Sequence, residues 1–383
     1  MAKSQSSRRL LPLLILLLLT GGYTLWQRWQ TQDTEEGTRV TNPTTGITDS
    51  GERTTSEPII SGALSQGTFQ VFFSNTYQND SEIGKNDPEN IDRQLSQFLS
   101  TATKEIDGAL FELESSLIAK ALIEAKGRGI QVRIVAESDY LENPEMQEVI
   151  AAGIPVVEDE RSSLMHNKFF VVDGKAVWTG SYNVTDNGAW RNNNNAVLIN
   201  SPELAENYRT EFDEMFLRNE FGPRSTSNTP HTLVKLPEGD IYNYFSPEDG
   251  VAEKILRFVK LAKSRIRFLA FSFTDDDLGD LLVEKHRQGI DVAGVVESRG
   301  SGLAHSELAK LQAAGIDVRT DGNKYVMHHK VIVVDNTWTI LGSFNFTANA
   351  ANSNDENLLI VKNPKVARMF EEEYQRIAAA ASN

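Results

Sequence analysis

The sequence predicts an α/β protein in which one α/β domain occurs twice. Three observations support this fold class: the chain resembles itself at a shift of about 160 residues, each copy alternates short apolar runs with helical periodicity, and the composition suits a globular core. The 383 residues are 40% hydrophobic, which excludes global disorder and a collagen-like chain. A length of this size accommodates two domains of roughly 100 to 200 residues.

The first part of the repeat aligns residues 106–137 with residues 266–297 without a gap. In each copy an apolar run precedes apolar residues at helical spacing, and Gly129 or Gly289 then ends the helix before a second apolar run. This order predicts a strand, a helix and a parallel strand, joined as a right-handed unit.

The second part of the repeat continues at a shift of 162 residues, through a pair of strands, to a final helix. Ser201 and Asn363 can cap these final helices, and the proline that follows each of them suits the first helical turn. We therefore expect two repeated α/β domains at residues 68–222 and 240–380, joined by a linker at 223–239.

Residues 1–30 predict an N-terminal membrane anchor or signal segment. Three basic residues precede an apolar run of 17 residues at positions 10–26, and residues 20–22 contain no clear small-x-small cleavage site. These features favour an uncleaved anchor, with the body of the chain membrane-anchored outside the cytoplasm, or secreted if the segment is cleaved. Residues 31–67 are polar and lack periodicity, which predicts a disordered linker.

The composition excludes several kinds of chemistry. There are no cysteines, which rules out disulfides, thiolate zinc sites and cysteine nucleophiles. The net charge is −15, and removing residues 1–30, which hold four basic and no acidic residues, leaves −19. Such an acidic body disfavours general nucleic-acid binding, because that binding depends on Lys and Arg neutralising phosphates.

Polar residues recur at matched positions of the second strand pair, where packing alone would not require them. The same spacing from histidine to lysine, aspartate, serine and asparagine occurs in His166, Lys168, Asp173, Ser181 and Asn183, and in His328, Lys330, Asp335, Ser343 and Asn345. Alternation along a strand places the histidine and lysine of each copy on one face. An imidazole beside an ammonium group suits a phosphodiester, since histidine can attack phosphorus or donate a proton while lysine neutralises the oxygens.

The duplicated HxKx4D motif followed by GSxN resembles the phospholipase D superfamily over residues 68–380. The resemblance implies two phospholipase D-like α/β domains that form a pseudo-twofold pair with one shared active site. It implies that one histidine forms a phosphohistidine while the other protonates the leaving oxygen, without a metal or cofactor. Since both motifs lie in one chain, no oligomer is required. The roles implied are catalytic for His166, Lys168, His328 and Lys330, and substrate-binding for Ser181, Asn183, Ser343 and Asn345.

Two pairs of residues are expected to support the site. Asp173 and Asp335 lie on the opposite strand face from the lysines, which predicts a structural role. The superfamily usually has an acidic residue about 11 positions after the last motif asparagine, and here this is Glu356 in the second half but Asn194 in the first.

The difference between Glu356 and Asn194 suggests an assignment of the two histidines. If each residue supports the histidine of its own half, Glu356 favours imidazolium on His328, which predicts His166 as the nucleophile and His328 as the general acid. The alternative is that another carboxylate serves His166.

The motifs alone do not distinguish phospholipid from nucleic-acid phosphodiesters as the substrate. The predicted membrane tether and the acidic body favour hydrolysis of phospholipid head groups. A metal-independent endonuclease is the alternative, because residues 328–357 look most like small bacterial endonucleases and mitochondrial cardiolipin hydrolases of the superfamily. A cardiolipin synthase-like transferase and a tethered, non-catalytic phosphate-binding module are further alternatives. The expected partners are thus a phospholipid or nucleic-acid phosphodiester, and the membrane through the N-terminal segment.

Overall fold

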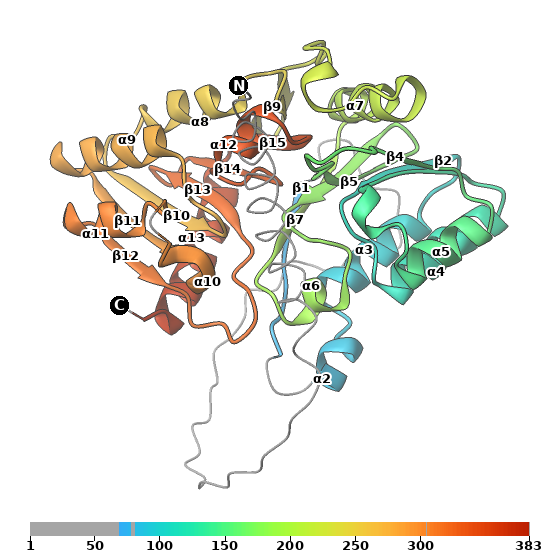
Figure 1. The fold of residues 1–383 in the computed structure, drawn as a ribbon, viewed down its shortest axis with the longest axis horizontal. Coiled ribbons are helices and arrows are strands. Elements are labelled where there is room, and N and C mark those ends of the chain that lie inside the picture. Colours follow the sequence, from blue (N-terminus) through green and yellow to red (C-terminus); the bar gives the residue numbers. More distant parts are fainter. Residues whose placement is uncertain (1–68, 78–80, 304, 383) are drawn as a thin grey trace, which may run out of the picture. The chain divides into compact units, whose positions relative to one another are not determined.

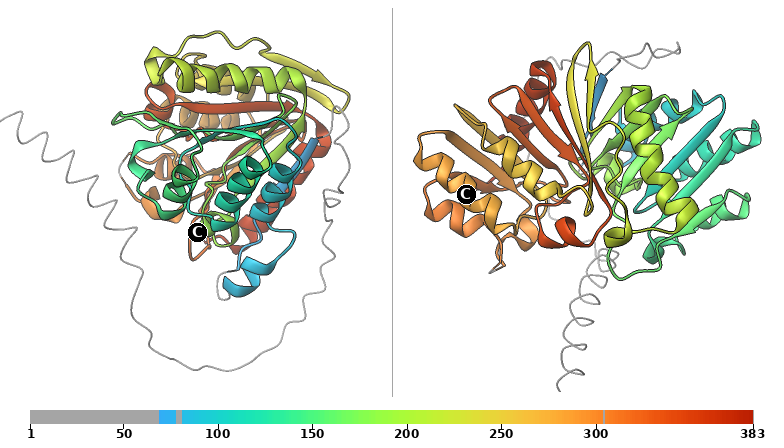
Figure 2. Two further views of the ribbon diagram at one scale, coloured as in Figure 1. Left: turned by 90° about the vertical axis from the view of Figure 1, so that its right-hand side faces the viewer. Right: turned by 90° about the horizontal axis from the view of Figure 1, so that it is seen from above.

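The structure, a computed structural model, describes residues 69–77, 81–303 and 305–382. These residues form two mixed β-sheets, with helices on both faces of each sheet (Figures 1 and 2). The strand order is β1-β7-β6-β5-β2-β3-β4 in the first sheet and β12-β11-β10-β13-β14-β15-β9-β8 in the second. The expected fold of two repeated α/β domains is therefore confirmed. The predicted anchor at 1–30 and the predicted linker at 31–67 lie outside the described residues.

The two halves share a common order of elements, to which the first half adds α2 and the second half adds β8 and α10. The first half contains β1 (Phe69–Phe73), α2 (Ser81–Asn86), α3 (Ile91–Ser100), β2 (Glu105–Leu110), α4 (Ser116–Gly127), β3 (Gln131–Ala136), α5 (Pro144–Ala151), β4 (Val156–Glu158), β5 (Lys168–Val172), β6 (Ala176–Gly180), α6 (Asp186–Trp190), β7 (Asn195–Asn200) and α7 (Pro202–Arg218). The second half contains β8 (Leu233–Leu236), β9 (Gly239–Ser246), α8 (Val251–Val259), β10 (Arg265–Ala270), α9 (Asp276–Arg287), β11 (Asp291–Val296), α10 (Ser298–Ser301), α11 (Leu308–Ala313), β12 (Asp317–Thr320), β13 (Lys330–Val334), β14 (Trp338–Gly342), α12 (Ala348–Asn352), β15 (Glu356–Lys362) and α13 (Pro364–Ala380).

The strand–helix–strand units predicted from the repeat are present in both halves. Strands β2 and β3 pair in parallel around α4, as β10 and β11 do around α9. The side chains of Ser115 and Asp275 accept hydrogen bonds at the helix N-termini. Gly129 and Gly289 have φ values of 87° and 88°, a left-handed conformation that ends each helix at low cost.

The final helix of each half packs on the inner face of its sheet. Ser201 and Asn363 cap α7 and α13 as predicted, with proline in the first turn. Apolar side chains of both helices and of both sheets belong to one buried cluster, which includes Tyr208, Phe245 and Phe370. This shared core holds the central strands β5 and β13 of the two halves in one framework, and both motifs lie at the start of these strands.

The stretch predicted as a linker, 223–239, is not all irregular. It contains the four residues of β8, which pairs with β9 at the edge of the second sheet. Among the described residues, no helix has the length and apolar character needed to cross a bilayer.

Candidate active site

The two motif segments meet because each forms backbone hydrogen bonds with the other half. The amide of His166 donates to the carbonyl of Asp355, and the amide of His328 donates to the carbonyl of Asn193, both at 2.9 Å. Short parallel bridges pair Met165 with Asp355 and Asn193 with Met327. The histidines are therefore fixed by contacts that cross between the halves, and they are only 5% and 7% exposed.

The two lysines of the motifs are buried with the histidines. The Nζ atoms of Lys168 and Lys330 donate to the carbonyls of His166 and His328 at 2.6 and 2.8 Å. Burial lowers the pKa of Lys168 to about 7, although the Glu356 carboxylate raises it, and burial also holds the pKa of Lys330 well below its usual range.

The charges of both lysines act on each of the two histidines. Burial lowers the pKa of each imidazole well below its usual range, and the charges of Lys168 and Lys330 add to this effect on both rings. An anionic phosphate bound beside the lysines would reverse part of the effect, because a negative charge favours protonation of the groups around it.

The residues that support the histidines are exchanged between the halves. The Nδ1 atom of His166 lies 2.8 Å from Oε2 of Glu356, whereas Nδ1 of His328 lies 3.0 Å from Oδ1 of Asn194. The prediction that each residue supports the histidine of its own half is therefore wrong. The physical reason is the pair of parallel bridges between the halves. The Asn193–Met327 bridge places Asn194 beside the second motif, and the Met165–Asp355 bridge places Glu356 beside the first.

Hydrogen bonds fix the tautomers of both rings. The amide nitrogen of Asn194 donates to the Gly188 carbonyl at 3.0 Å, so its Oδ1 faces His328 as an acceptor. The carbonyl of Ser181 also accepts from Nδ1 of His328 at 3.0 Å. Since these partners and the Glu356 carboxylate are acceptors, each histidine carries its proton on Nδ1 and leaves Nε2 for chemistry.

Ser181 and Ser343, predicted to bind substrate, contact the residues that support the histidines. Both are fully buried. The hydroxyl of Ser181 donates to Oδ1 of Asn194 at 2.9 Å, and the hydroxyl of Ser343 donates to Oε2 of Glu356 at 2.6 Å. Each hydroxyl also accepts a backbone N–H from the start of β7 or β15. The serines thus orient the residues that hold the histidines.

Asn183 and Asn345, also predicted to bind substrate, lie half-buried after the serines. Each has an Oδ1 atom that is buried without a hydrogen-bond partner. The Nδ2 atom of Asn183 donates to Oε2 of Glu112 at 3.2 Å. Burial raises the pKa of Glu112 to about 8, with a further contribution from the charge of Glu114.

The motif aspartates hold the turns that follow β5 and β13. The carboxylate of Asp173 accepts the backbone N–H groups of residues 103–105, and that of Asp335 accepts those of residues 263–265. Both aspartates adopt a left-handed backbone, with φ of 55° and 53°. These contacts connect each turn to the start of β2 or β10, which is a structural role.

Two phenylalanines complete the site, and sequence reasoning did not place them beside the histidines. The rings of Phe111 and Phe271 each lie 4.7 Å from the imidazole of their own half. The Nζ atoms of Lys168 and Lys330 lie 4.7 and 4.6 Å from the same rings. The signal was available, because these phenylalanines occupy matched positions in the repeat.

The residue between histidine and lysine in each motif binds the opposite half. Asn167 accepts from Nδ2 of Asn357 at 2.8 Å, and Nδ1 of His329 lies 2.8 Å from Nδ2 of Asn195. The other ring nitrogen of His329 lies 2.9 Å from the Glu373 carboxylate of α13. A single sequence gives no signal for the two contacts between the halves, because their partners are 190 and 134 residues apart.

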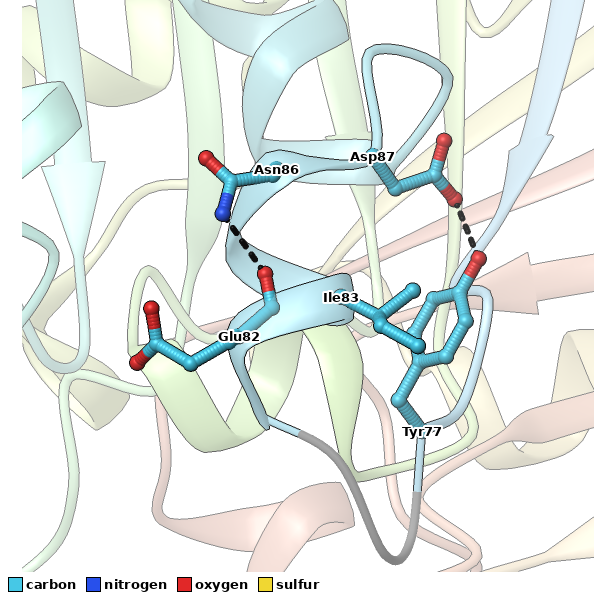
Figure 3. A pocket seen from close by; sticks show the side chains of 5 residues that line it. All are labelled: Tyr77, Glu82, Ile83, Asn86 and Asp87. Carbon is cyan, nitrogen blue, oxygen red and sulfur yellow. Dashed lines mark hydrogen bonds between the residues drawn. The ribbon is translucent and has the colours of Figure 1, made fainter.

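A surface pocket lies away from the motif residues. It is lined by Tyr77, Glu82, Ile83, Asn86 and Asp87, and the Tyr77 hydroxyl donates to Asp87 at 2.9 Å (Figure 3). None of the predicted site residues lines it, so the pocket is separate from the histidine–lysine pairs. Within the described ranges, no group of three or more His, Asp or Glu side chains is placed to hold a metal ion.

Comparison with known proteins identifies relatives of both halves. The model of a family described as "Cardiolipin synthase, PLD-like domain" matches residues 95–216 and again residues 255–378. Mitochondrial cardiolipin hydrolase of Homo sapiens is 34% identical over 145 residues, which are 38% of this chain and 57% of that protein. Phospholipase D of Rickettsia prowazekii is 32% identical over 140 residues, which are 37% of this chain and 68% of that protein. The matches thus span little more than half of the human relative.

A solved structure covers both halves together. Phosphatidylserine synthase of Haemophilus influenzae aligns with 80% of this chain and 86% of its own chain, with a TM-score of 0.60 and 14% identity. At this identity the likeness concerns the fold, with its two mixed sheets in one chain.

Proposed function

Because the chain belongs to the phospholipase D superfamily and carries the PLD-like domain twice, we propose that it hydrolyses phosphodiesters through a phosphohistidine. The observation that carries this proposal is the meeting of two buried histidine–lysine pairs, one from each half, with each histidine oriented through Nδ1 by the other half. Two oriented imidazoles supply the nucleophile and the proton donor that a two-step displacement requires. The two ammonium groups supply positive charge where the non-bridging oxygens would lie.

We assign the nucleophile to His166 on grounds different from those of the sequence prediction. When Nε2 of His166 bonds to phosphorus, its ring becomes positively charged while Nδ1 keeps its proton. The Glu356 carboxylate at 2.8 Å stabilises that charge, which the neutral amide of Asn194 cannot do for His328. Because its partner is neutral, His328 forms a more acidic imidazolium and is suited to proton donation.

The proposed reaction then has two balanced steps. In the first, His328 starts as the imidazolium that the bound anionic substrate favours. Nε2 of His166 attacks phosphorus while the bond to the leaving alcohol breaks, and Nε2 of His328 gives that oxygen its proton. In the second, neutral His328 takes a proton from water, whose oxygen attacks phosphorus and displaces His166. The products are an alcohol and a phosphate monoester, and both histidines return to their starting states.

The proposed substrate class is phospholipid. Two relatives bear the names cardiolipin hydrolase and phospholipase D, and both names denote action on phospholipids. The net charge of −15 disfavours the binding of long nucleic acids.

We further propose that residues 1–30 tether the chain to a membrane, with the body outside the cytoplasm. Deleting these residues should release the protein from the membrane fraction, and continued sedimentation with membranes would contradict the tether.

The full chain in neutral detergent, assayed with EDTA present, tests this function. We expect hydrolysis of a phospholipid, with release of a phosphate monoester, and no hydrolysis by His166→Ala. Activity that disappears with EDTA, or survives in His166→Ala, would contradict the mechanism. Cleavage of single-stranded DNA without lipid hydrolysis would identify the endonuclease alternative.

Transfer to an alcohol is a second candidate reaction, favoured by the words "Cardiolipin synthase" in the description of the matching family. Transfer differs from hydrolysis only in the second step, where an alcohol takes the place of water. Adding glycerol to the assay separates the two reactions. Phosphatidylglycerol as the main product would indicate a transferase, and phosphatidic acid would indicate a hydrolase.

A further inference from the structure

Basic side chains gather on helix α8 and on the turn that follows it. The buried side chains of α8 pack with Ile332 and Val334, on the opposite face of the second sheet from α13, where α8 lies beside α9 (Figure 1). Away from the sheet, four basic residues recur at every third position: Lys254, Arg257, Lys260 and Lys263. Residues 251–263 contain one acidic residue, Glu253, so four basic minus one acidic gives this segment a charge of +3 in a chain of −15.

These four charges are not neutralised within the described part of the chain. None of the four side chains forms an ion pair with a carboxylate there. The Nζ atom of Lys254 lies 5.3 Å from the ring of Tyr244, which positions its charge without cancelling it. The Asp335 carboxylate lies near Lys263, but it accepts the backbone N–H groups of residues 263–265. The cations are therefore available to an anionic partner.

Apolar side chains lie among these cations. Leu261 follows Lys260 directly and is 49% exposed. The half-buried ring of Trp338 lies 5.0 Å from the ring of Phe258 on α8, and the Nζ atom of Lys362 lies 5.4 Å from the same tryptophan. We call the six residues Lys254, Arg257, Lys260, Leu261, Lys263 and Trp338 the α8 surface. Cations beside leucine and tryptophan are typical of surfaces that rest between the head groups and the acyl chains of a bilayer.

The first half contains the same backbone without these side chains. Asp173 and Asp335 accept N–H groups of the matched residues 103–105 and 263–265, which aligns α3 with α8. The positions that match the α8 surface hold uncharged residues: Gln94, Gln97, Ser100, Thr101, Thr103 and Ala176. Residues 91–103 contain one arginine and one aspartate, which gives a charge of zero. Because α3 folds without the cations, folding does not account for them in α8, and they indicate an anionic partner of this half.

We propose that the α8 surface docks the body of the protein on a bilayer that contains anionic lipid. Cations concentrated on one helix allow an acidic protein to approach an anionic membrane, because the attraction acts only within about a Debye length, roughly 8 Å at physiological salt. Leu261 and Trp338 then enter the boundary between head groups and acyl chains. A nucleic acid offers phosphates to the cations but no apolar layer to the leucine, so the composition favours a lipid surface.

The α8 surface is separate from the histidine–lysine pairs. Lys263 lies two residues before the start of β10, whereas Phe271, whose ring packs beside His328, follows the end of that strand. A strand of this length spans about 20 Å. The proposed docking therefore does not depend on the residues of the proposed reaction, and it is tested without hydrolysis.

A single fluorescent label on the full chain tests which face lies on the bilayer. Because the chain has no cysteine, Leu261→Cys provides one labelling position on the α8 surface, and Thr101→Cys provides the exposed, matched position in the first half. Both variants also carry His166→Ala, so that the vesicles are not hydrolysed. On vesicles of phosphatidylcholine and phosphatidylglycerol, we expect the emission of a polarity-sensitive label to shift to the blue at position 261 and to stay unchanged at position 101. High salt, or vesicles of phosphatidylcholine alone, should abolish the shift.

Charge variants provide an independent measurement. In the full chain with His166→Ala, four substitutions remove the cations of the α8 surface: Lys254→Gln, Arg257→Gln, Lys260→Gln and Lys263→Gln. A control variant changes the net charge equally, with glutamine in place of four exposed cations of the first half, Lys104, Lys120, Arg128 and Lys175. We expect the first variant to bind anionic vesicles at least about tenfold more weakly, and the control to change by less than about twofold. Neither variant should alter binding to vesicles of phosphatidylcholine alone.

An unshifted label at position 261 on anionic vesicles, or equal shifts at positions 261 and 101, would overturn the proposal. A single-stranded oligonucleotide that binds the wild-type chain but not the four-glutamine variant, with no shift at position 261 on vesicles, would identify a nucleic acid as the partner instead. With His166 intact, the four-glutamine variant should hydrolyse phospholipid in detergent micelles at the wild-type rate. A chain that docks without hydrolysing phospholipid contradicts the proposed function alone, and one that hydrolyses without docking contradicts this inference alone.

Discussion

The two halves of the molecule share a backbone but differ in the residues around it. At one position the first half has Asn194 and the second has Glu356, and each supports the histidine of the other half. Where the first half has the ion pair of Arg161 with Asp355, the matched contact is the amide pair of Asn323 with Asn193. The comparison teaches that the duplicated backbone fixes the geometry of the site. Amino-acid differences at equivalent positions then give the two histidines different partners.

The largest effect is expected from removing either motif histidine. His166→Ala and His328→Ala should each lower kcat by at least about 10³-fold, because the two rings serve one reaction. The double variant should be no worse than either single variant, as is usual for groups that act as a unit. If each half worked alone, each single variant would keep about half of the rate. Steady-state kinetics distinguish these outcomes.

The next effect concerns the two matched contacts between the halves. Arg161→Met leaves the Asp355 carboxylate buried without its cation, so we expect a loss of about 3 to 5 kcal/mol in the free energy of unfolding. Asn323→Ala, at the matched position, removes neutral hydrogen bonds and should cost only about 1 kcal/mol. Urea unfolding measures both values. Equal losses would show that charge does not distinguish the two contacts.

A smaller effect separates the two supporting residues. Glu356→Gln removes a charge-assisted hydrogen bond worth about 1.5 to 3 kcal/mol, so kcat/KM should fall roughly 10- to 150-fold. Asn194→Ala removes a neutral bond and should cost less, roughly 2- to 12-fold.

The pH profile of Glu356→Gln provides an independent check. Burial raises the pKa of Glu356 to about 7, although the Lys168 charge lowers it, so the carboxylate forms as pH rises through about 7. Wild-type kcat/KM should therefore decline below about pH 7, and the variant should lack this acid limb. An unchanged acid limb would assign it to another group.

The smallest difference is expected at Asp173 and Asp335. Burial raises the pKa of each carboxyl, but hydrogen bonds from the adjoining loop outweigh it and leave the pKa below its usual range. A depressed pKa contributes stability that is present above the unfolded value and is lost as pH falls. Asp173→Asn and Asp335→Asn should each weaken the pH dependence of unfolding below about pH 4, by similar amounts, without altering activity at neutral pH. A large loss of activity would indicate a role beyond structure.

The repeat made much of the fold predictable, because matched periodicity at a fixed shift defines strands, helices and their caps. The motif residues also followed from spacing. The exchange of Asn194 and Glu356 between the histidines did not, since alignment shows which residues are equivalent but not which half they face. Alignment likewise does not show that the hydroxyls of Ser181 and Ser343 donate hydrogen bonds to Asn194 and Glu356.

The central claim, that Glu356 makes His166 the nucleophile, is tested by locating the covalent phosphoryl group. Bis(p-nitrophenyl) phosphate needs no protonation of its leaving group, so His328→Ala should release about one nitrophenolate per enzyme and then stall. Mass spectrometry after alkaline quenching should find the adduct on His166. An adduct on His328 in the wild-type protein, or an equal burst from His166→Ala, would contradict the assignment.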